Sequence, residues 1–222
     1  GQLTVITKVE VQGRFGNGQG QEYTEQFLLE FQREDDGEWI RFKNRQGVEH
    51  FNGNKNTYLT EMCEVDPPIV CKRIRFIPFS QARRTVCMRV ELYGCKWTSG
   101  VVAYAMPQGD RRGAEVDLFD FTYDGMFFEN YLSNGLGQLV DGETGIDNFR
   151  SDKHNFGIKG YDWVGWKNDT MIRSKPVEII FKFDQVRNFT SISLHSNNYF
   201  SKDVRVFRKA VLFFSVAGKY FQ

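Results

Sequence analysis

The sequence predicts an all-β protein, folded as a β-sandwich or a distorted barrel. Short apolar segments alternate with turn residues along the chain, and no long stretch shows helical periodicity. The segment 86–93 also alternates apolar and polar side chains, as a half-buried strand does. The 222 residues, 41% hydrophobic and 15% aromatic, can bury one or two cores of about 100 to 150 residues each.

The predicted strands fall into two groups on either side of a boundary near residues 96–100, which gives expected domains 1–95 and 96–222. Those of the first group are 5–11, 27–32, 39–42, 58–60, 72–77 and 86–93. Those of the second are 177–183, 191–195, 204–207 and 211–216. Between the second and third strands, Glu34-Asp35-Asp36-Gly37 is a hairpin signal, since Asp and Gly tolerate the positive φ angles of tight turns.

Two cysteines mark the ends of the strand that closes the first group. Cys87 and Cys95 share the face opposite Met88, Val90 and Leu92, which we expect to point to the core. Eight residues of strand separate the two Cα atoms by roughly 26 Å, and a disulfide tolerates no more than about 7 Å. Each therefore needs a partner elsewhere.

The chain has four cysteines, so three pairings exist if all are bridged internally. Cys63 and Cys71 flank Asp66-Pro67-Pro68, which we interpret as a turn-forming insert between strands. A local bridge between them is the prediction, and two free buried thiols are the alternative.

Composition and charge exclude several classes of function. Lys and Arg total 29 against 28 for Asp and Glu, so no global field attracts nucleic acid or a membrane surface. No apolar run reaches the ~18 residues of a membrane span, and the first residues resemble no signal peptide, so we expect any anchor outside this chain. Sequons at Asn168 and Asn188 suggest exposed, glycosylated loops in an oxidising compartment.

Catalytic motifs are absent from the sequence. His50, His154 and His195 each lie far from a nucleophile motif. The glycine-rich run 16–20 lacks the lysine and the helix of a phosphate-binding loop. We therefore expect a binding protein and no enzyme.

A family resemblance extends over nearly the whole chain. It is carried, in order, by Gln12-Gly13-Arg14, Gly53-Asn54, Arg75-Phe76-Ile77-Pro78 and the segment 86–95, and then by Tyr123-Asp124-Gly125, the segment 135–142 and the segment 160–166. The first set resembles a discoidin domain, and the second resembles the discoidin-like domain that follows it in the collagen-binding discoidin domain receptors. The resemblance implies two discoidin-type β-sandwich, or distorted jelly-roll, domains. It also implies that the first lacks its opening strands and the second its closing strand.

The glycine-rich loop 13–22 is the candidate collagen site. If the loop closes, Arg14 and Glu22 come within salt-bridge reach. In the resembled receptors, the residues matching Arg14, Glu22 and Thr85 line a trench for the collagen triple helix, and its remaining wall would lie before Gly1. The alternative is a solvated hairpin tip of no specific function.

A calcium site is the second implied feature. The family pattern maps onto the side chains of Gln138 and Asp141 and onto the backbone at Glu143 and Tyr161, and Trp163 adds a carbonyl. Oxygen ligands of this kind suit calcium. The chain departs from the pattern at Phe119, where an asparagine is expected, and it lacks a serine-glutamate pair. The alternative is an acidic turn in which Asp141 caps backbone amides.

This chain lacks one cysteine pair of the family and keeps two other family cysteines. Ser196 and Leu212 stand where vertebrate relatives place a disulfide pair. The resemblance also implies that Cys87 and Cys95 bond residues upstream of this sequence.

We therefore expect an ectodomain fragment of a cell-surface, single-pass receptor tyrosine kinase that binds triple-helical collagen and is dimeric in its parent. Its kinase would lie in another part of the parent. The alternative is a secreted discoidin module that binds glycans or anionic phospholipid.

Overall fold

The computed structural model describes residues 1–16, 20–81, 83, 85–168 and 176–222. The middle of the glycine-rich loop, Arg84, and Thr170 of the first sequon lie outside these ranges. The described residues form antiparallel strands and one short 3-10 helix, Phe200–Lys202, with no α-helix among them. The predicted all-β class is confirmed.

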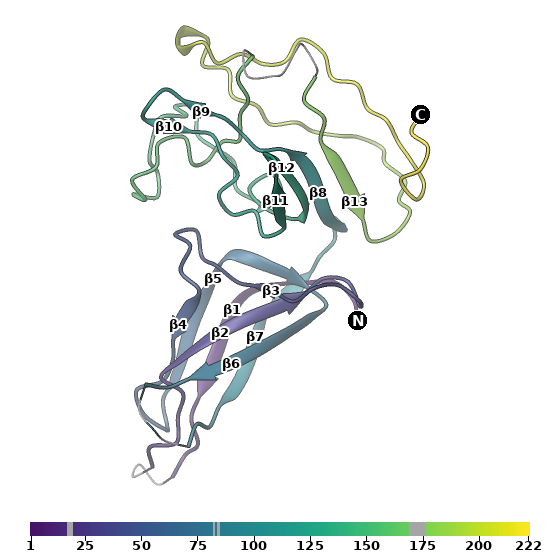
Figure 1. Cartoon of the computed structure of the whole chain (residues 1–222). Helices are drawn as coiled ribbons and strands as arrows, with labels where there is room; N and C mark the ends of the chain where they lie inside the picture. The colour runs from purple at the N-terminus through teal and green to yellow at the C-terminus, as the bar shows by residue number, and fades with distance from the viewer. Residues whose placement is uncertain (17–19, 82, 84, 169–175) are drawn as a thin grey trace.

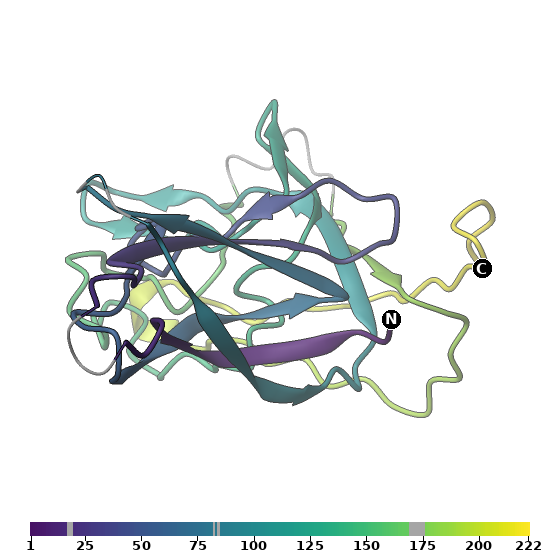
Figure 2. The ribbon, with the colours of Figure 1, turned by 90° about the horizontal axis from the view of Figure 1, so that it is seen from below.

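Residues 1–96 form two facing sheets (Figures 1 and 2). One has the order β5-β1-β7, with β1 at Thr4–Gln12, β5 at Thr60–Cys71 and β7 at Arg89–Lys96. In the other, β2 (Gln26–Gln32) pairs with β3 (Ile40–Arg41), β4 (His50–Asn52) and β6 (Arg73–Phe79). Between the sheets lies a core that includes Val9, Val11, Phe27 and Leu29, each fully buried. Burial of such side chains is the main stabilising contribution to the sandwich.

The first strand of the second assembly is separated from β7 by the four residues 97–100. Its main sheet has the order β11-β12-β8-β13, with β8 at Val101–Pro107, β11 at Met126–Phe128, β12 at Tyr131–Gly135 and β13 at Ile180–Phe183. A small ladder pairs β9 (Arg111–Arg112) with β10 (Val116–Asp117). Its core contains Tyr104, Met106 and Leu132, and also Leu3 and Val70 from the first assembly. The two assemblies therefore share apolar contacts.

Most predicted strands of the first group are present, but the proline segment is not a turn. β5 runs through Asp66-Pro67-Pro68 as one strand. The prolines fall where the pairing with β1 is interrupted, between the pairs Lys8 with Glu64 and Ile6 with Ile69. β5 also lies at the edge of its sheet. Proline lacks a donor N–H, so an edge strand with an irregular ladder can accept it.

The continuity of β5 excludes the predicted Cys63–Cys71 bridge. Cys63 lies opposite Val9 on β1 and Cys71 lies opposite Thr4, so the two thiols stand at different ends of one extended strand. All four cysteines, including Cys87 and Cys95, are free thiols in the structure. Cys71 is buried, as the alternative of two free buried thiols expects, whereas Cys63 is only partly buried.

The closing strand of the first group differs in burial from its prediction. Met88 packs against the core, but Val90 and Leu92 are exposed, because β7 is an edge strand whose residues are all accessible. The predicted strands 191–195, 204–207 and 211–216 are wrong, since none of these described segments pairs into a sheet. Alternating side chains do not make a strand without a partner for the backbone hydrogen bonds.

Candidate functional site

The loop that joins β1 to β2 brings two of the predicted collagen-site residues together. Arg14 Nη1 lies 3.0 Å from Glu22 Oε2, and the Arg14 backbone N–H donates to the Glu22 carbonyl over 2.9 Å. Gly13 makes this approach possible, because a Cβ at this position would lie 2.6 Å from the Cβ of Tyr23. The described ends of the loop are thus closed by a backbone bond and an ion pair.

Thr85, the third predicted residue, is exposed, and no hydrogen bond joins its side chain to Arg14 or Glu22. Its segment is held nearby, since Thr24 Oγ1 lies 3.4 Å from the Cys87 carbonyl oxygen. Phe15 is a large exposed apolar side chain beside Arg14. The loop therefore presents a cation, an anion and an aromatic ring to solvent.

Buried polar side chains support the base of this loop. Asn54 donates from Nδ2 to the carbonyls of Val11 and Leu59, at 2.9 and 3.0 Å. Thr57 is buried against Gly13 and Gly20. The sequence motif contained Gly53-Asn54, but the motif alone did not reveal that Asn54 fixes the end of β1.

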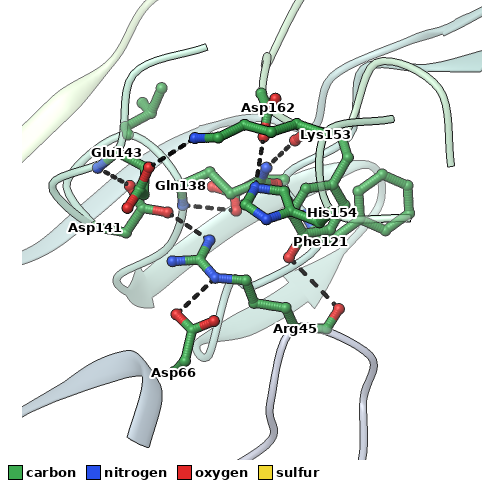
Figure 3. A network of polar contacts seen from close by, with 12 residues as sticks. Arg45, Asp66, Phe121, Gln138, Asp141, Glu143, Lys153, His154 and Asp162 are labelled. Atoms are coloured by element: carbon green, nitrogen blue, oxygen red, sulfur yellow. Dashed lines mark hydrogen bonds and ion pairs between the residues drawn. The ribbon is translucent and has the colours of Figure 1, made fainter. Parts of the chain in front are cut away.

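The four predicted calcium-site residues meet in one small hollow (Figure 3). Gln138, Asp141, Glu143 and Tyr161 line it together with Arg45 and Asp162. Gln138 donates from its amide to the Tyr161 carbonyl and accepts at Oε1 from the Phe121 backbone N–H over 2.6 Å. Asp141 Oδ1 accepts from the Glu143 backbone N–H over 2.9 Å. This bond agrees with the alternative hypothesis, in which Asp141 caps backbone amides in an acidic turn.

Arg45 is a part of this site that sequence reasoning missed. It comes from the loop between β3 and β4, and its side chain is 6% exposed. Nη1 lies 3.0 Å from Asp141 Oδ2 and Nε lies 2.7 Å from Asp66 Oδ1. No local motif predicts this contact, because Arg45 and Asp141 are 96 residues apart.

Burial and charge act against each other in this network. Desolvation raises the pKa of Asp141, while the Glu143 amide and the Arg45 guanidinium lower it, and the net shift is upward. For Arg45, desolvation lowers the pKa, but the hydrogen bonds with Asp66 and Asp141 outweigh it and the net shift is upward. Arg45 therefore remains charged and neutralises the buried carboxylate.

A second buried carboxylate is hydrogen-bonded to the backbone of Gln138, one of the residues that line the hollow. Asp120 accepts hydrogen bonds from the Tyr104 hydroxyl and from the Gln138 backbone N–H, the latter over 3.0 Å. Desolvation raises its pKa to about 6, although both hydrogen bonds oppose the shift. It thereby connects the core to the loop that carries Gln138.

The residues that line the hollow carry the atom types that suit a hard cation, a carboxylate, an amide oxygen and backbone carbonyls, but Gln138 Oε1 already accepts from the Phe121 N–H and the Tyr161 carbonyl from the Gln138 amide. No group of three or more His, Cys, Asp or Glu side chains among the described residues is arranged to hold a metal. An ion here would rest on Asp141 and neutral oxygens. Phe119, which replaces the expected asparagine, packs its ring near that of Phe121 and offers no ligand atom.

The two predicted glycosylation acceptors lie on the surface. Asn188 and Asn168 are exposed, as glycosylation acceptors must be.

In the described parts of the chain, no helix has the length and apolar character needed to cross a bilayer.

Comparison with known proteins matches both halves of the chain. Residues 1–92 match the F5/8 type C domain, and residues 100–222 match the discoidin domain-containing receptor 1/2, DS-like domain. The fold and these matches define a discoidin-type β protein. More particularly, the chain belongs to the family of discoidin domain-containing receptors.

Individual relatives agree with this assignment. The chain is 36% identical over 219 residues to discoidin domain-containing receptor tyrosine kinase B of Caenorhabditis elegans. The aligned region covers 98% of this chain and 26% of the relative. It is 36% identical over 206 residues to epithelial discoidin domain-containing receptor 1 of Homo sapiens, covering 92% of this chain and 22% of the relative. The chain thus spans about a quarter of the length of these relatives, and it matches their discoidin-type region.

Proposed function

We propose that this chain is the extracellular, collagen-binding region of a receptor tyrosine kinase. The observation that carries the proposal is the contact between Arg14 and Glu22 at 3.0 Å, in an exposed loop that also presents Phe15. A triple helix displays carbonyls and separate side chains along a rigid rod, so little ligand entropy is lost on binding. Arg14 can donate to such carbonyls while Glu22 accepts from donors or pairs with basic side chains.

Energetics favour a binding role for the ion pair over a structural one. Both side chains are solvent-exposed, and exposed pairs contribute only about 0 to 1 kcal/mol to stability. By contrast, the loop base is fixed by Gly13 and Asn54, which do not depend on the two charges. Replacing either charge should therefore change recognition without unfolding the domain.

The arrangement in a parent protein is part of the same proposal. Residues 1–95 would be a discoidin domain and 96–222 a discoidin-like domain, in the ectodomain of a single-pass cell-surface receptor. The names of the relatives, which include a receptor tyrosine kinase, support this arrangement. A kinase elsewhere in the parent would respond when collagen alters the arrangement of a receptor dimer.

Calcium is the proposed structural ion of the second assembly. Gln138 and Asp141 would hold it by side chain, and Glu143 and Tyr161 chiefly by backbone. The convergence of these residues on one hollow supports this choice. Because Arg45 already occupies Asp141 Oδ2, the ion would share this carboxylate with the guanidinium.

The test of collagen binding uses the full-length protein that carries this chain. Arg14→Ala and Glu22→Ala should each weaken binding to a triple-helical collagen peptide, measured by surface plasmon resonance, with the thermal unfolding midpoint unchanged. Lys8→Ala is the matched control, since Lys8 and Glu64 form a comparable exposed pair at 2.7 Å on β1. Unchanged affinity in both loop variants would refute the site. Binding to anionic liposomes in place of collagen would favour the phospholipid alternative.

A further inference from the structure

A cluster of basic side chains lies at the opposite end of the molecule from the loop 13–22 (Figure 1). Three segments that are far apart in the sequence supply it: β9, the turn at residues 149–150, and the stretch 202–209, which begins in the 3-10 helix. Figure 1 shows this short helix above β9 and β10. We call the cluster the basic patch, and its cations are Arg112, Arg150, Lys202, Arg205, Arg208 and Lys209.

A buried ring and a backbone carbonyl hold two of these cations in place. Arg112 donates from Nη2 to the Lys202 carbonyl, which joins β9 to the helix across 90 residues of sequence. The guanidinium carbons of Arg112 and Arg150 lie 5.4 and 5.9 Å from the centre of the buried Phe149 ring. Phe149 in turn makes an edge contact with Tyr199, which precedes the helix. Guanidinium groups over an aromatic ring are attracted to it, so the three segments are fixed as one surface.

The stretch 202–209 carries the remaining cations of the patch. The guanidinium carbon of Arg205 lies 5.3 Å from the centre of the Phe200 ring. Arg208 and Lys209 follow in the same exposed stretch, so its eight residues hold four cations and one carboxylate. A short run rich in Lys and Arg is the sequence pattern of sites that bind polyanions.

The positive charge of the patch is not compensated by the protein. None of its six cations forms an ion pair with another described residue. Most neighbouring carboxylates bond other groups: Asp117 pairs with Arg111 at 2.7 Å, Glu115 pairs with Lys159 at 3.1 Å, and Asp110 and Asp152 accept from backbone N–H groups. The carboxylates of Asp147 and Asp203 remain. Six cations against two carboxylates leave a local excess of charge, although the whole chain has a net charge of only +1.

We propose that the basic patch binds a sulfated glycosaminoglycan, a linear polysaccharide with sulfate groups along its length. The proposal rests on the extracellular location proposed above, where such chains occur, and not on collagen binding. A guanidinium group matches two oxygens of a tetrahedral anion at once. Cations from three segments can contact successive sulfates of one chain. Because Arg112 and Arg150 are already held over Phe149, they lose little freedom on binding.

The arrangement of the rings favours a sugar chain over a membrane surface. Side chains that enter a bilayer present a broad apolar face to it. In the basic patch, Phe149 is buried beneath two guanidinium groups and Phe200 faces a third, so charge forms the contact surface. Val206 and Phe207 are 49% and 53% exposed in the same stretch, which makes an anionic bilayer the alternative to test.

Affinity of the full-length protein for a heparin oligosaccharide, measured by surface plasmon resonance, tests the proposal. Lys202→Ala/Arg205→Ala should weaken binding about tenfold or more, because it removes two charge-assisted contacts. The Lys202 carbonyl that Arg112 uses remains in this variant. Lys55→Ala/Arg89→Ala is the matched control, since it removes the same two charges from exposed positions of the first assembly and should bind as the wild type does. Thermal unfolding verifies that both variants stay folded.

The chemistry of the ligand is tested with altered probes. A chemically desulfated heparin oligosaccharide should bind about tenfold or more weakly, since only carboxylates remain for the guanidinium groups. Added salt should weaken binding of the sulfated probe in the wild type more than in the double variant, because the variant makes fewer charge contacts. Arg205→Lys should keep part of the affinity, because it retains the charge without the paired hydrogen bonds.

Three results would overturn the proposal: no binding of heparin, equal binding of the sulfated and desulfated probes, or wild-type affinity in Lys202→Ala/Arg205→Ala. Binding to phosphatidylserine liposomes that this variant loses, without any binding of heparin, would assign the patch to a membrane instead. The same variant should bind a triple-helical collagen peptide as the wild type does. Failure of the heparin site and failure of the collagen site are therefore distinguishable.

Discussion

Arg45 Nη1 lies 3.0 Å from Asp141 Oδ2, and this buried ion pair joins the loop after β3 to the hollow of the second assembly (Figure 3). Arg33 with Asp124, and Lys182 with Glu34, are further ion pairs between residues of the two assemblies. The Arg45 pair differs from the exposed Lys182 pair because both of its side chains are only 6% exposed. Its loss would leave a charge in a site with little water.

Arg45→Ala should destabilise the protein by about 3 kcal/mol, because it leaves the Asp141 carboxylate buried without its cation. Denaturant unfolding measures the change. Lys182→Ala, at the exposed pair with Glu34, is the control and should cost about 1 kcal/mol or less. The Arg45→Met/Asp141→Leu double variant should recover most of the loss, since it removes both charges. A single Arg45 variant as stable as the control would show that the pair does not hold the assemblies together.

Asp120 should make stability fall as the pH rises from about 4 to about 6. Burial raises its folded pKa to about 6, above the ~3.9 of an unfolded aspartate, so the folded state binds the proton more tightly in this window. The stabilisation is complete below the unfolded pKa and is lost as pH passes the folded one. The size of the effect is about 3 kcal/mol.

Asp120→Asn is the matched variant for this prediction. The amide can still accept from the Gln138 N–H, and the Tyr104 hydroxyl can turn to accept from the amide nitrogen. Urea unfolding from pH 4 to 7 should show the downward slope in the wild type and a flatter profile in the variant. Identical profiles would mean that another group causes the slope.

Calcium should raise the thermal unfolding temperature of the full-length protein, and Asp141→Asn should abolish this shift. A ligand that binds only the folded state stabilises it in proportion to the logarithm of its concentration. Magnesium is the control cation, because it requires tighter octahedral geometry and releases its water reluctantly. An equal response to both ions, or a response that survives in the variant, would count against a specific site.

The sequence was sufficient for the β class, and it failed where contacts are long-range. The ends of strands such as Thr4–Gln12 and Gln26–Gln32 agree with their patterns to within a residue. The pattern around Pro67 and Pro68 predicts a turn, because local rules do not reveal that β5 is an edge strand with an interrupted ladder.

The candidate sites show the same division between local and long-range information. Arg14 and Glu22 lie at the two ends of one loop, so their contact could be predicted from the chain itself. Arg45 enters the hollow around Asp141 from the first assembly, and only the tertiary structure brings it there. The described segments after β13, which join no sheet, have strand-like alternation, and alternation does not specify a pairing partner.

A double-mutant cycle on Arg14 and Glu22, measured as affinity of the full-length protein for a triple-helical collagen peptide, tests the central claim most directly. If the ion pair acts as one recognition unit, the two Ala substitutions should each weaken binding at least about tenfold, and the double variant should be little weaker than either single one. A heat-unfolded peptide of the same sequence should not bind. Wild-type affinity in the double variant would contradict the account.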